Sequence, residues 1–239
     1  MWGNERVSEE FVPNLCAGAM ELVRSAAGTR GTKPYPVGGL AKRSLDVSLG
    51  LIFGFLLLPL IILIALVVYF SNPGPIVYRH KRIGFGGKEF ACLKFRTMVT
   101  DGERILREHL QELPEARKEW DETRKLTNDP RVTRLGAILR KSSLDELPQL
   151  LNVLRGDMSI VGPRPIVRDE LEIYGASSSY YLKARPGLTG AWQISGRSDT
   201  TYAERIALDT HYVSQWNFVT DFAIVVRTVP AVILAKGSR

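Results

Sequence analysis

One uninterrupted apolar run dominates the pattern of hydrophobic and polar positions along the chain. Residues 47–70 are 24 consecutive positions without Asp, Glu, Lys, Arg or His. A helix that spans a membrane needs about 20 apolar residues. More than 40 residues precede the run and no small-residue cleavage site follows it, so a cleavable signal peptide does not fit. The pattern therefore predicts a membrane helix, and the alternative is a buried core helix.

Pro59 divides this run almost at its centre, and its ring and missing N–H kink or break a helix. At 1.5 Å per residue each half is about 17 Å long, too short for about 30 Å of hydrocarbon. Positive charge tends to stay cytoplasmic. Basic residues stand on both flanks: Lys42, Arg43, Arg79, Lys81 and Arg82. We therefore expect a re-entrant helix, broken at Pro59, that enters and leaves by the cytoplasmic face. A straight span is the alternative, because membrane helices tolerate proline.

The remaining pattern predicts a mostly helical α+β domain. Residues 76–82 and 89–98 have the composition of two strands and flank a glycine cluster typical of a hairpin turn. Residues 101–126 are charge-rich and helical, with Pro114 as an interruption. An amphipathic helix is predicted over residues 201–216.

Two further helices complete this prediction. Ser143-Leu144-Asp145-Glu146 fits a capping box that opens a helix running to about Leu154. The last helix, residues 218–235, is more apolar, and it lies either against the membrane interface or on the domain. We expect three parts in the chain: a poorly ordered extension (1–40), the re-entrant membrane helix (41–72) and a cytoplasmic domain (73–239).

Composition narrows the chemistry only moderately. There are 32 Lys and Arg against 25 Asp and Glu, a net charge of +7, which suits nucleic acid, an anionic membrane surface or phosphate-bearing substrates. The two cysteines cannot build a disulfide framework. With three histidines and no CxxC pair, a structural zinc site does not fit either.

Acidic and basic side chains gather in tight clusters within the predicted domain. They are Lys94 with Arg96, Arg140 ahead of Asp145 and Glu146, Asp157 ahead of Arg164, and the loop residues Arg185 and Arg197. Carboxylates in a first helical turn also stabilise the helix dipole, by about 0.3–1 kcal/mol, so a purely structural role is one interpretation. The combination of acidic and basic clusters favours a catalytic interpretation instead. Arginines in rigid turns suit phosphate recognition, one carboxylate can hold Mg²⁺, and a second can attack phosphorus.

At these residues the chain resembles the bacterial sugar transferases, the monotopic phosphoglycosyl transferases. The motifs come in the family's order and cover about residues 40–239. They are Lys94-Phe95-Arg96-Thr97-Met98, Asp129-Pro130-Arg131-Val132-Thr133, Leu139-Arg140-Lys141-Ser142-Ser143-Leu144-Asp145-Glu146-Leu147-Pro148-Gln149, Gly156-Asp157-Met158-Ser159-Ile160-Val161-Gly162-Pro163-Arg164-Pro165 and Arg185-Pro186-Gly187-Leu188-Thr189-Gly190.

The resemblance implies a role for each site residue. Asp145 is the expected nucleophile of a covalent sugar-phosphate intermediate. Glu146 is expected to bind Mg²⁺ with help from Asp157. Arg164 is expected to hold a phosphate, in a basic pocket shaped by Lys94, Arg96 and Arg140. Arg185 and Arg197 are expected to serve the nucleotide or the structure of their own loops.

The implied protein is an enzyme of the bacterial inner membrane whose catalytic domain faces the cytoplasm. It transfers hexose-1-phosphate from UDP-galactose or UDP-glucose to undecaprenyl phosphate, releases UMP and initiates exopolysaccharide synthesis. One alternative is direct transfer in a ternary complex, with Asp145 as a metal ligand or base. Another is a non-catalytic scaffold for polysaccharide assembly, which leaves the charged clusters unexplained. We expect no nucleic-acid partner, because no nucleic-acid motif is present. The oligomeric state stays open, a homodimer included.

Overall fold

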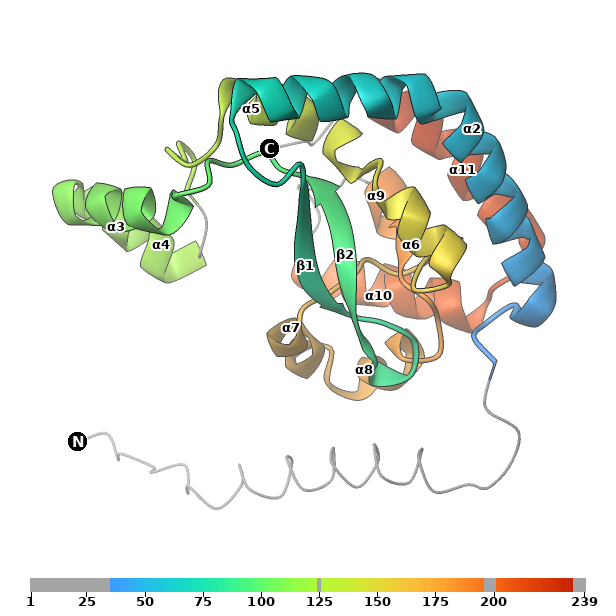
Figure 1. Ribbon diagram of the computed structural model, residues 1–239. Coiled ribbons are helices and arrows are strands. Elements are labelled where there is room, and N and C mark those ends of the chain that lie inside the picture. Colours follow the sequence, from blue (N-terminus) through green and yellow to red (C-terminus); the bar gives the residue numbers. More distant parts are fainter. Residues whose placement is uncertain (1–34, 124–125, 196–200, 234–239) are drawn as a thin grey trace, which may run out of the picture. The chain divides into compact units, whose positions relative to one another are not determined.

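The computed structural model describes residues 35–123, 126–195 and 201–233, and the chain from Tyr35 onward forms one unit (Figure 1). Most of the expected N-terminal extension lies outside these residues. Its last part is bound to the domain, because the Val37 N–H donates to the Lys183 carbonyl (2.9 Å) and the Val37 side chain packs on the core. The expected α+β class, mostly helical, is confirmed.

Helix α2, Gly39–Ser71, contains the apolar run. It is one continuous helix that passes through Pro59 and bends along its length, so the two expected halves remain joined (Figure 1). A proline removes a single backbone hydrogen bond, and the turns on either side hold the helix together.

One face of α2 packs on the domain through side chains such as Phe53, Ile64 and Val68. The other face is bare, with Phe55 79% and Phe70 77% exposed. Only 11% of the most apolar 18-residue stretch of α2 is buried, whereas the core helix of a soluble protein would be mostly buried. In the described part of the chain, α2 alone is long and apolar enough to cross a membrane. These observations favour the membrane helix over the core helix.

The expected hairpin is present as β1, Val77–Ile83, and β2, Glu89–Phe95, which pair antiparallel around the short 3₁₀ turn η1, Phe85–Gly87. The charged segment that follows forms α3, Gly102–Glu112, and α4, Pro114–Thr123. Pro114 separates these helices, as predicted, and they extend away from the other elements (Figure 1).

The segment expected to begin with a capping box is built differently. Helix α5, Arg134–Lys141, is followed by the 3₁₀ turn η2, Leu144–Glu146, and only then by α6, Gln149–Arg155. Ser143 has a left-handed backbone (φ 57°) and makes no capping hydrogen bond. The expected cap at Ser143 is wrong because a cap residue needs an extended backbone to aim its side chain at the first free N–H groups.

Two of the family motifs meet in a short parallel sheet. Strand β3, Ser159–Val161, pairs with β4, Gly187–Thr189. Between them the chain forms α7, Arg168–Ile173, η3, Gly175–Ser177, and α8, Ser178–Tyr181, and α9, Ala191–Ile194, follows. A Cβ atom at Gly162 would lie 2.4 Å from the Arg185 carbonyl oxygen, and one at Gly187 would lie 2.1 Å from the Gly162 nitrogen. The backbones therefore approach closely only because both residues are glycine.

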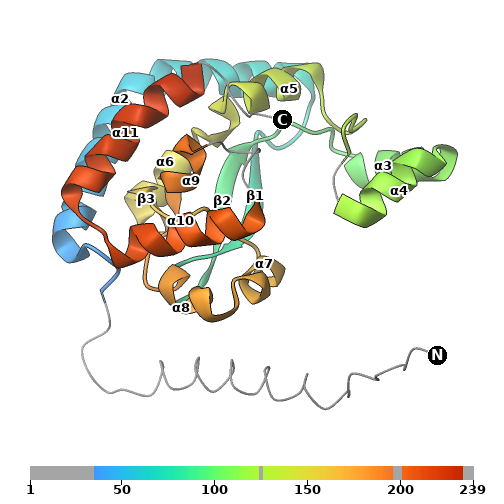
Figure 2. The same cartoon turned by 180° about the vertical axis from the view of Figure 1, so that it is seen from behind.

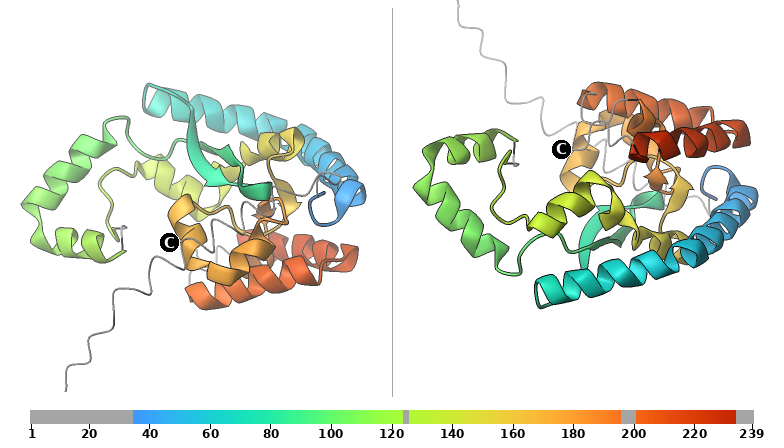
Figure 3. Two further views of the ribbon diagram at one scale, coloured as in Figure 1. Left: turned by 90° about the horizontal axis from the view of Figure 1, so that it is seen from below. Right: turned by 90° about the horizontal axis from the view of Figure 1, so that it is seen from above.

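The last two helices are α10, Tyr202–Ser214, and α11, Phe218–Ile233. The inner face of α11 packs on the core through Ile224 and Val225. Its outer face is apolar and exposed: Phe218, Val219, Phe222, Val226 and Val229. The packing of this helix on the domain is confirmed, and its exposed apolar face leaves contact with the membrane interface as a prediction. Helices α2 and α11 border the same side of the domain, with the segment of α6 and β3 between them (Figures 2 and 3).

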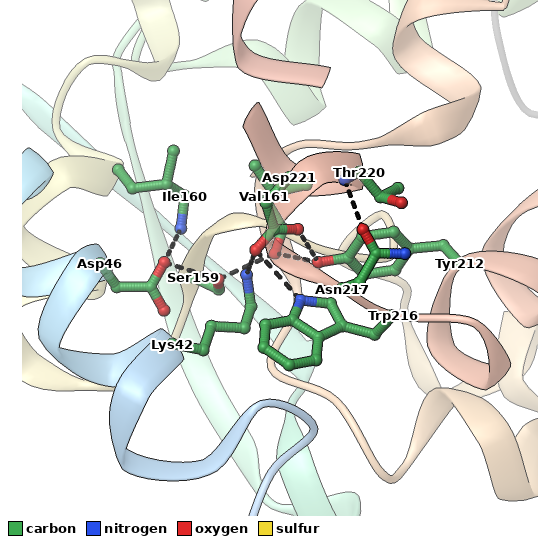
Figure 4. A network of polar contacts seen from close by, with 10 residues as sticks. All are labelled: Lys42, Asp46, Ser159, Ile160, Val161, Tyr212, Trp216, Asn217, Thr220 and Asp221. Carbon is green, nitrogen blue, oxygen red and sulfur yellow. Dashed lines mark hydrogen bonds and ion pairs between the residues drawn. The ribbon is translucent and has the colours of Figure 1, made fainter. Parts of the chain in front are cut away.

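A buried polar network fastens the N-terminal end of α2 to the domain (Figure 4). Lys42 Nζ lies 2.6 Å from Asp221 Oδ2, and both side chains are almost fully buried. Asp221 also accepts hydrogen bonds from the Tyr212 hydroxyl (2.7 Å) and Trp216 Nε1 (3.1 Å). One turn further along α2, Asp46 accepts from the Ser159 hydroxyl and from the Ile160 N–H.

The same domain holds the other end of α2. Arg96, which directly follows β2, donates to the carbonyl oxygens of Asn72 and Pro73 just beyond the helix. Near the N-terminal end, Arg43 donates to the Val153 and Leu154 carbonyls at the end of α6. One folded domain binds both ends of α2, which favours the predicted re-entrant helix, with both ends on the same side of a membrane.

This arrangement predicts the labelling of single cysteines at Leu40 and Pro75, which are both exposed. In a Cys16→Ser background, a membrane-impermeant maleimide should label neither site in intact cells and both sites after the membrane is opened. The buried Cys92 supplies no background. Labelling of only one of the two sites from outside would establish a straight span.

Candidate active site

The end of β2 and the turn η2 bring Lys94, Asp145 and Glu146 together. Lys94 Nζ lies 2.6 Å from Glu146 Oε1 and 3.7 Å from Asp145 Oδ2. The Asp145 side chain is 10% exposed, whereas that of Glu146 is 36% exposed. One cation therefore serves two adjacent carboxylates, of which one lies inside the protein and the other reaches solvent.

The backbone of η2 orients these carboxylates. Ser143 occupies the left-handed region without being glycine, which costs about 1–2 kcal/mol. This conformation turns the chain sharply between α5 and η2 and directs the Asp145 side chain inward. Leu144 and Leu147, on either side of the acidic pair, pack against the cluster that contains Ile64 and Val68 of α2. The acidic pair is thus held beside the membrane helix.

Burial and charge act in opposite directions on this pair. Burial raises the pKa of Asp145, Lys94 opposes that rise, and the neighbouring charge of Glu146 adds to it. Burial alone would lower the pKa of Lys94, but the two carboxylates outweigh it and the pKa is raised. Lys94 is therefore cationic at neutral pH and keeps the buried Asp145 ionised more readily than burial alone would allow.

Arg140 supplies a second positive charge near Asp145, and this charge also lowers the pKa of the carboxyl group. Its Nε donates to the Thr97 hydroxyl (2.8 Å), which fixes the side chain between α5 and the end of β2. The start of α5 and the segment after β2 lie in close contact. A Cβ atom at Gly136 would be only 2.0 Å from the Thr97 carbonyl oxygen, so this position requires glycine.

Arg164 lies within electrostatic range of Glu146. Its guanidinium carbon is 4.8 Å from the centre of the Trp192 ring. Among the described residues the Arg164 side chain takes part in no hydrogen bond or ion pair. Its N–H groups are therefore free to bind an anion.

Three further predicted site residues make contacts of their own. Arg96 binds the carbonyls beyond α2, and Asp157 accepts a hydrogen bond from Asn152 Nδ2 (3.2 Å). Arg185 donates to the Gly156 carbonyl (2.8 Å) and so stabilises the C-terminal end of α6. Arg197 lies outside the described residues. The roles predicted for these four residues stay predictions.

Sequence reasoning missed Thr97, Trp192 and Arg205. Arg205 Cζ lies 4.7 Å from the centre of the same Trp192 ring that Arg164 approaches. In the sequence Arg205 looks like one more charge on the solvated face of an amphipathic helix. Trp192, seven positions after Arg185, gave no periodic signal. Cys92, in contrast, is no nucleophile, because burial raises the pKa of its thiol to about 11.

The acidic pair fits a hard divalent cation. Within the described ranges no three His, Cys, Asp or Glu side chains gather around a common point. Mg²⁺ needs no such cage, because it binds through one or two carboxylates together with substrate phosphates and water. The half-exposed Glu146 carboxylate offers that kind of ligand.

Comparison with known proteins agrees with this geometry. The family model described as bacterial sugar transferase matches residues 37–235. The chain belongs to the bacterial sugar transferase family. The exopolysaccharide production protein ExoY of Sinorhizobium fredii is 56% identical over 203 residues, 85% of this chain and 90% of that protein.

Two further relatives carry more specific names. The undecaprenyl-phosphate galactose phosphotransferase of Salmonella typhimurium is 47% identical over 197 residues, 82% of this chain and 41% of that protein. The UDP-glucose:undecaprenyl-phosphate glucose-1-phosphate transferase of Caulobacter vibrioides is 42% identical over 216 residues, 87% of this chain and 75% of that protein. The chain is thus a sugar transferase, and its bare apolar helix gives it a membrane location.

Lys94 should set the pH at which this sugar transferase loses activity in acid. Asp145 must be ionised to act as a nucleophile, a base or a metal ligand, so the rate falls as pH drops through its pKa. Lys94→Met removes the charge that lowers this pKa, and the acid limb of the pH–rate profile should move upward by about 1 pH unit. Lys94→Arg should leave the limb near its original pH. Lys88→Met, at the exposed hairpin turn, is the matched control. If the acid limb of the pH–rate profile does not move in Lys94→Met, Lys94 does not control the pKa of Asp145.

Proposed function

We propose that this protein transfers hexose-1-phosphate from a UDP-hexose to undecaprenyl phosphate, releasing UMP, as the initiating step of exopolysaccharide synthesis. The names of the relatives support the reaction class, with galactose in one and glucose in another. The single observation that carries the proposal is the position of Asp145. It is a buried carboxylate flanked by Lys94 and Arg140, on a turn that contacts the membrane helix.

The chemistry proceeds in two displacements at one phosphorus atom. A carboxylate oxygen of Asp145 bonds to the phosphorus that carries the sugar, and the bond from this phosphorus to the bridging oxygen breaks, so UMP leaves with the electron pair. An oxygen of undecaprenyl phosphate then bonds to the same phosphorus and displaces the Asp145 carboxylate. The cations around Asp145 offset the repulsion between an anionic nucleophile and an anionic diphosphate.

The location of the site supports a lipid acceptor. Leu144 and Leu147 connect η2 to the inner face of α2, and the outer faces of α2 and α11 are apolar. An acceptor whose phosphate lies at a membrane surface therefore approaches the acidic pair along the side of the domain that meets the lipid. We propose that this surface is the cytoplasmic face of the inner membrane, because basic residues flank both ends of α2. A non-catalytic scaffold would need neither the buried carboxylate nor its cations.

The nucleophile is tested by the covalent intermediate. Wild-type protein given UDP-hexose alone should gain the mass of one hexose phosphate on the peptide that contains Asp145, as detected by rapid-quench mass spectrometry. Asp145→Asn should gain none, and its activity should fall by orders of magnitude. Asp169→Asn, an exposed carboxylate of α7, is the matched control and should form the adduct normally. An absent adduct, with kinetics that require both substrates at once, would replace this mechanism with direct transfer in a ternary complex.

Mg²⁺ is proposed as the cofactor, with Glu146 as its main protein ligand and Asp157 in an assisting role. When bound, the cation would neutralise phosphate charge. Chelation should abolish transfer, and added Mg²⁺ should restore it. Glu146→Gln should reduce activity by about a hundredfold or more and weaken Mn²⁺ binding measured by electron paramagnetic resonance, because a neutral amide is a poorer ligand. Full activity in excess chelator would exclude the metal.

A further inference from the structure

A second group of positive charges lies next to the acidic pair. Arg82 and Arg205 share one carboxylate, Glu170, at 3.4 Å and 3.9 Å. Arg164 lies within electrostatic range of Arg82, Arg205 and Glu170. The side chains of Arg82 and Arg205 are each 15% exposed. Three guanidinium groups therefore lie close together and share one carboxylate, Glu170. The net charge of this group is positive, which favours the binding of an anion.

Aromatic rings hold two of these guanidinium groups in place. Arg164 Cζ and Arg205 Cζ lie 4.8 Å and 4.7 Å from the centre of the Trp192 ring, and Arg205 Cζ lies 4.9 Å from that of Tyr202. Cation–π contact stabilises an arginine without using its N–H donors. The two side chains are thus oriented before any ligand arrives.

The donors of this group are largely unused. Among the described residues, the 3.9 Å ion pair with Glu170 is the only polar contact of the Arg205 side chain, and its buried Nε has no hydrogen-bond partner. Trp192 Nε1 and the Tyr202 hydroxyl are also buried and have no hydrogen-bond partner within the part of the chain that the structure describes. Unpaired buried donors are rare in folded proteins and call for a physical explanation.

Asp209 does little to neutralise this charge. Burial raises its pKa to about 7, so that it is partly protonated at neutral pH. Its Oδ2 atom accepts a hydrogen bond from the Tyr174 hydroxyl (2.9 Å). Burial, followed by the charge of Arg205, lowers the pKa of Arg164, which shows how closely the cations are placed.

We propose that Arg205 and Arg164, both stacked on Trp192, form a two-guanidinium clamp that binds a phosphate group of a substrate beside Asp145 and Glu146. This inference rests on the proposed function for the identity of the substrates. Two phosphates have the required chemistry: the nucleotide-side phosphate of the UDP-sugar and the phosphate of the lipid acceptor. Planar guanidinium groups suit both, because each offers two parallel N–H donors to phosphate oxygens.

Equilibrium binding tests the clamp independently of turnover. UMP binding to the full-length protein in nanodiscs is measured by calorimetry, and the KM for undecaprenyl phosphate is measured in the transfer assay. Arg205→Gln should weaken one of these two interactions by roughly tenfold to a hundredfold. A weaker UMP complex identifies the nucleotide phosphate, and a raised lipid KM identifies the acceptor phosphate. Arg205→Lys should have an intermediate effect.

Glu170→Gln tests the clamp with the opposite sign. The amide keeps the shape of the side chain and can still accept from the Val167 N–H, as the carboxylate does (3.0 Å). Loss of the competing negative charge should tighten phosphate binding several-fold. Arg168→Gln, an exposed arginine paired with Glu89, is the matched control and should change neither quantity. Because Glu170→Gln leaves both arginines in place, it tests the clamp even if Arg205→Gln lowers the melting temperature of the protein.

The outcomes separate this inference from the proposed function. Normal transfer, with UMP affinity and lipid KM unchanged in both Arg205→Gln and Glu170→Gln, would overturn the clamp and leave the function intact. Weaker binding in both variants would also overturn it, because the ion pair would then be purely structural. UMP binding that depends on Arg205 in a protein without transfer activity would support the clamp and refute the function.

Discussion

The ion pair between Lys42 and Asp221 is the interaction on which the placement of the other elements depends. It joins the start of the membrane helix to the last helix of the domain, across 179 positions of sequence. Both charges are buried, and Tyr212 and Trp216 complete the hydrogen bonding of Asp221. Removing one partner of such a pair leaves an uncompensated buried charge and costs about 3–5 kcal/mol. The pair therefore determines where α2 meets the domain more than it adds to net stability.

Once α2 is anchored there, its course across the domain positions the acidic pair. The helix bends over α6 and reaches Leu144 and Leu147 with its second half (Figure 1). Arg96 then holds the chain where the helix ends. Apolar contacts set the depth of η2 below the membrane-facing side, and polar contacts at the two ends prevent the helix from sliding. The helix with the exposed apolar face thus also supports the turn that carries the acidic pair.

The active site itself depends on opposing electrostatic effects. Burial makes the Asp145 carboxylate harder to ionise, and the adjacent Glu146 adds to this effect. Lys94 and Arg140 act against both. A desolvated carboxylate is poorly hydrated, and fixed cations beside it favour its ionised form, which suits the proposed attack on an anionic phosphate. The strained backbone at Ser143 is the local cost of this placement.

The sequence by itself determined the features that depend on neighbouring residues. Local pattern predicts the apolar run, the hairpin around the glycine cluster, the separation of α3 from α4 at Pro114 and the amphipathic helix that appears as α10. The family motifs also predicted Lys94, Asp145 and Arg164 as site residues, from short blocks of neighbouring residues. In each case the physical cause lies within a few positions of the residue concerned.

Only the tertiary structure decided the rest. Ser143 looks like a helix cap, but it adopts a left-handed turn, and the leucines on either side of the acidic pair pack against residues of α2. Arg96 was expected in the basic pocket and Arg185 at the nucleotide or within its own loop, and the structure shows in addition that each binds a backbone carbonyl far away in the sequence. Arg205 reads as a solvated charge, yet it stacks on Trp192 beside Arg164. A side chain's role depends on which distant groups share its burial and its charge, and local sequence carries no record of those partners.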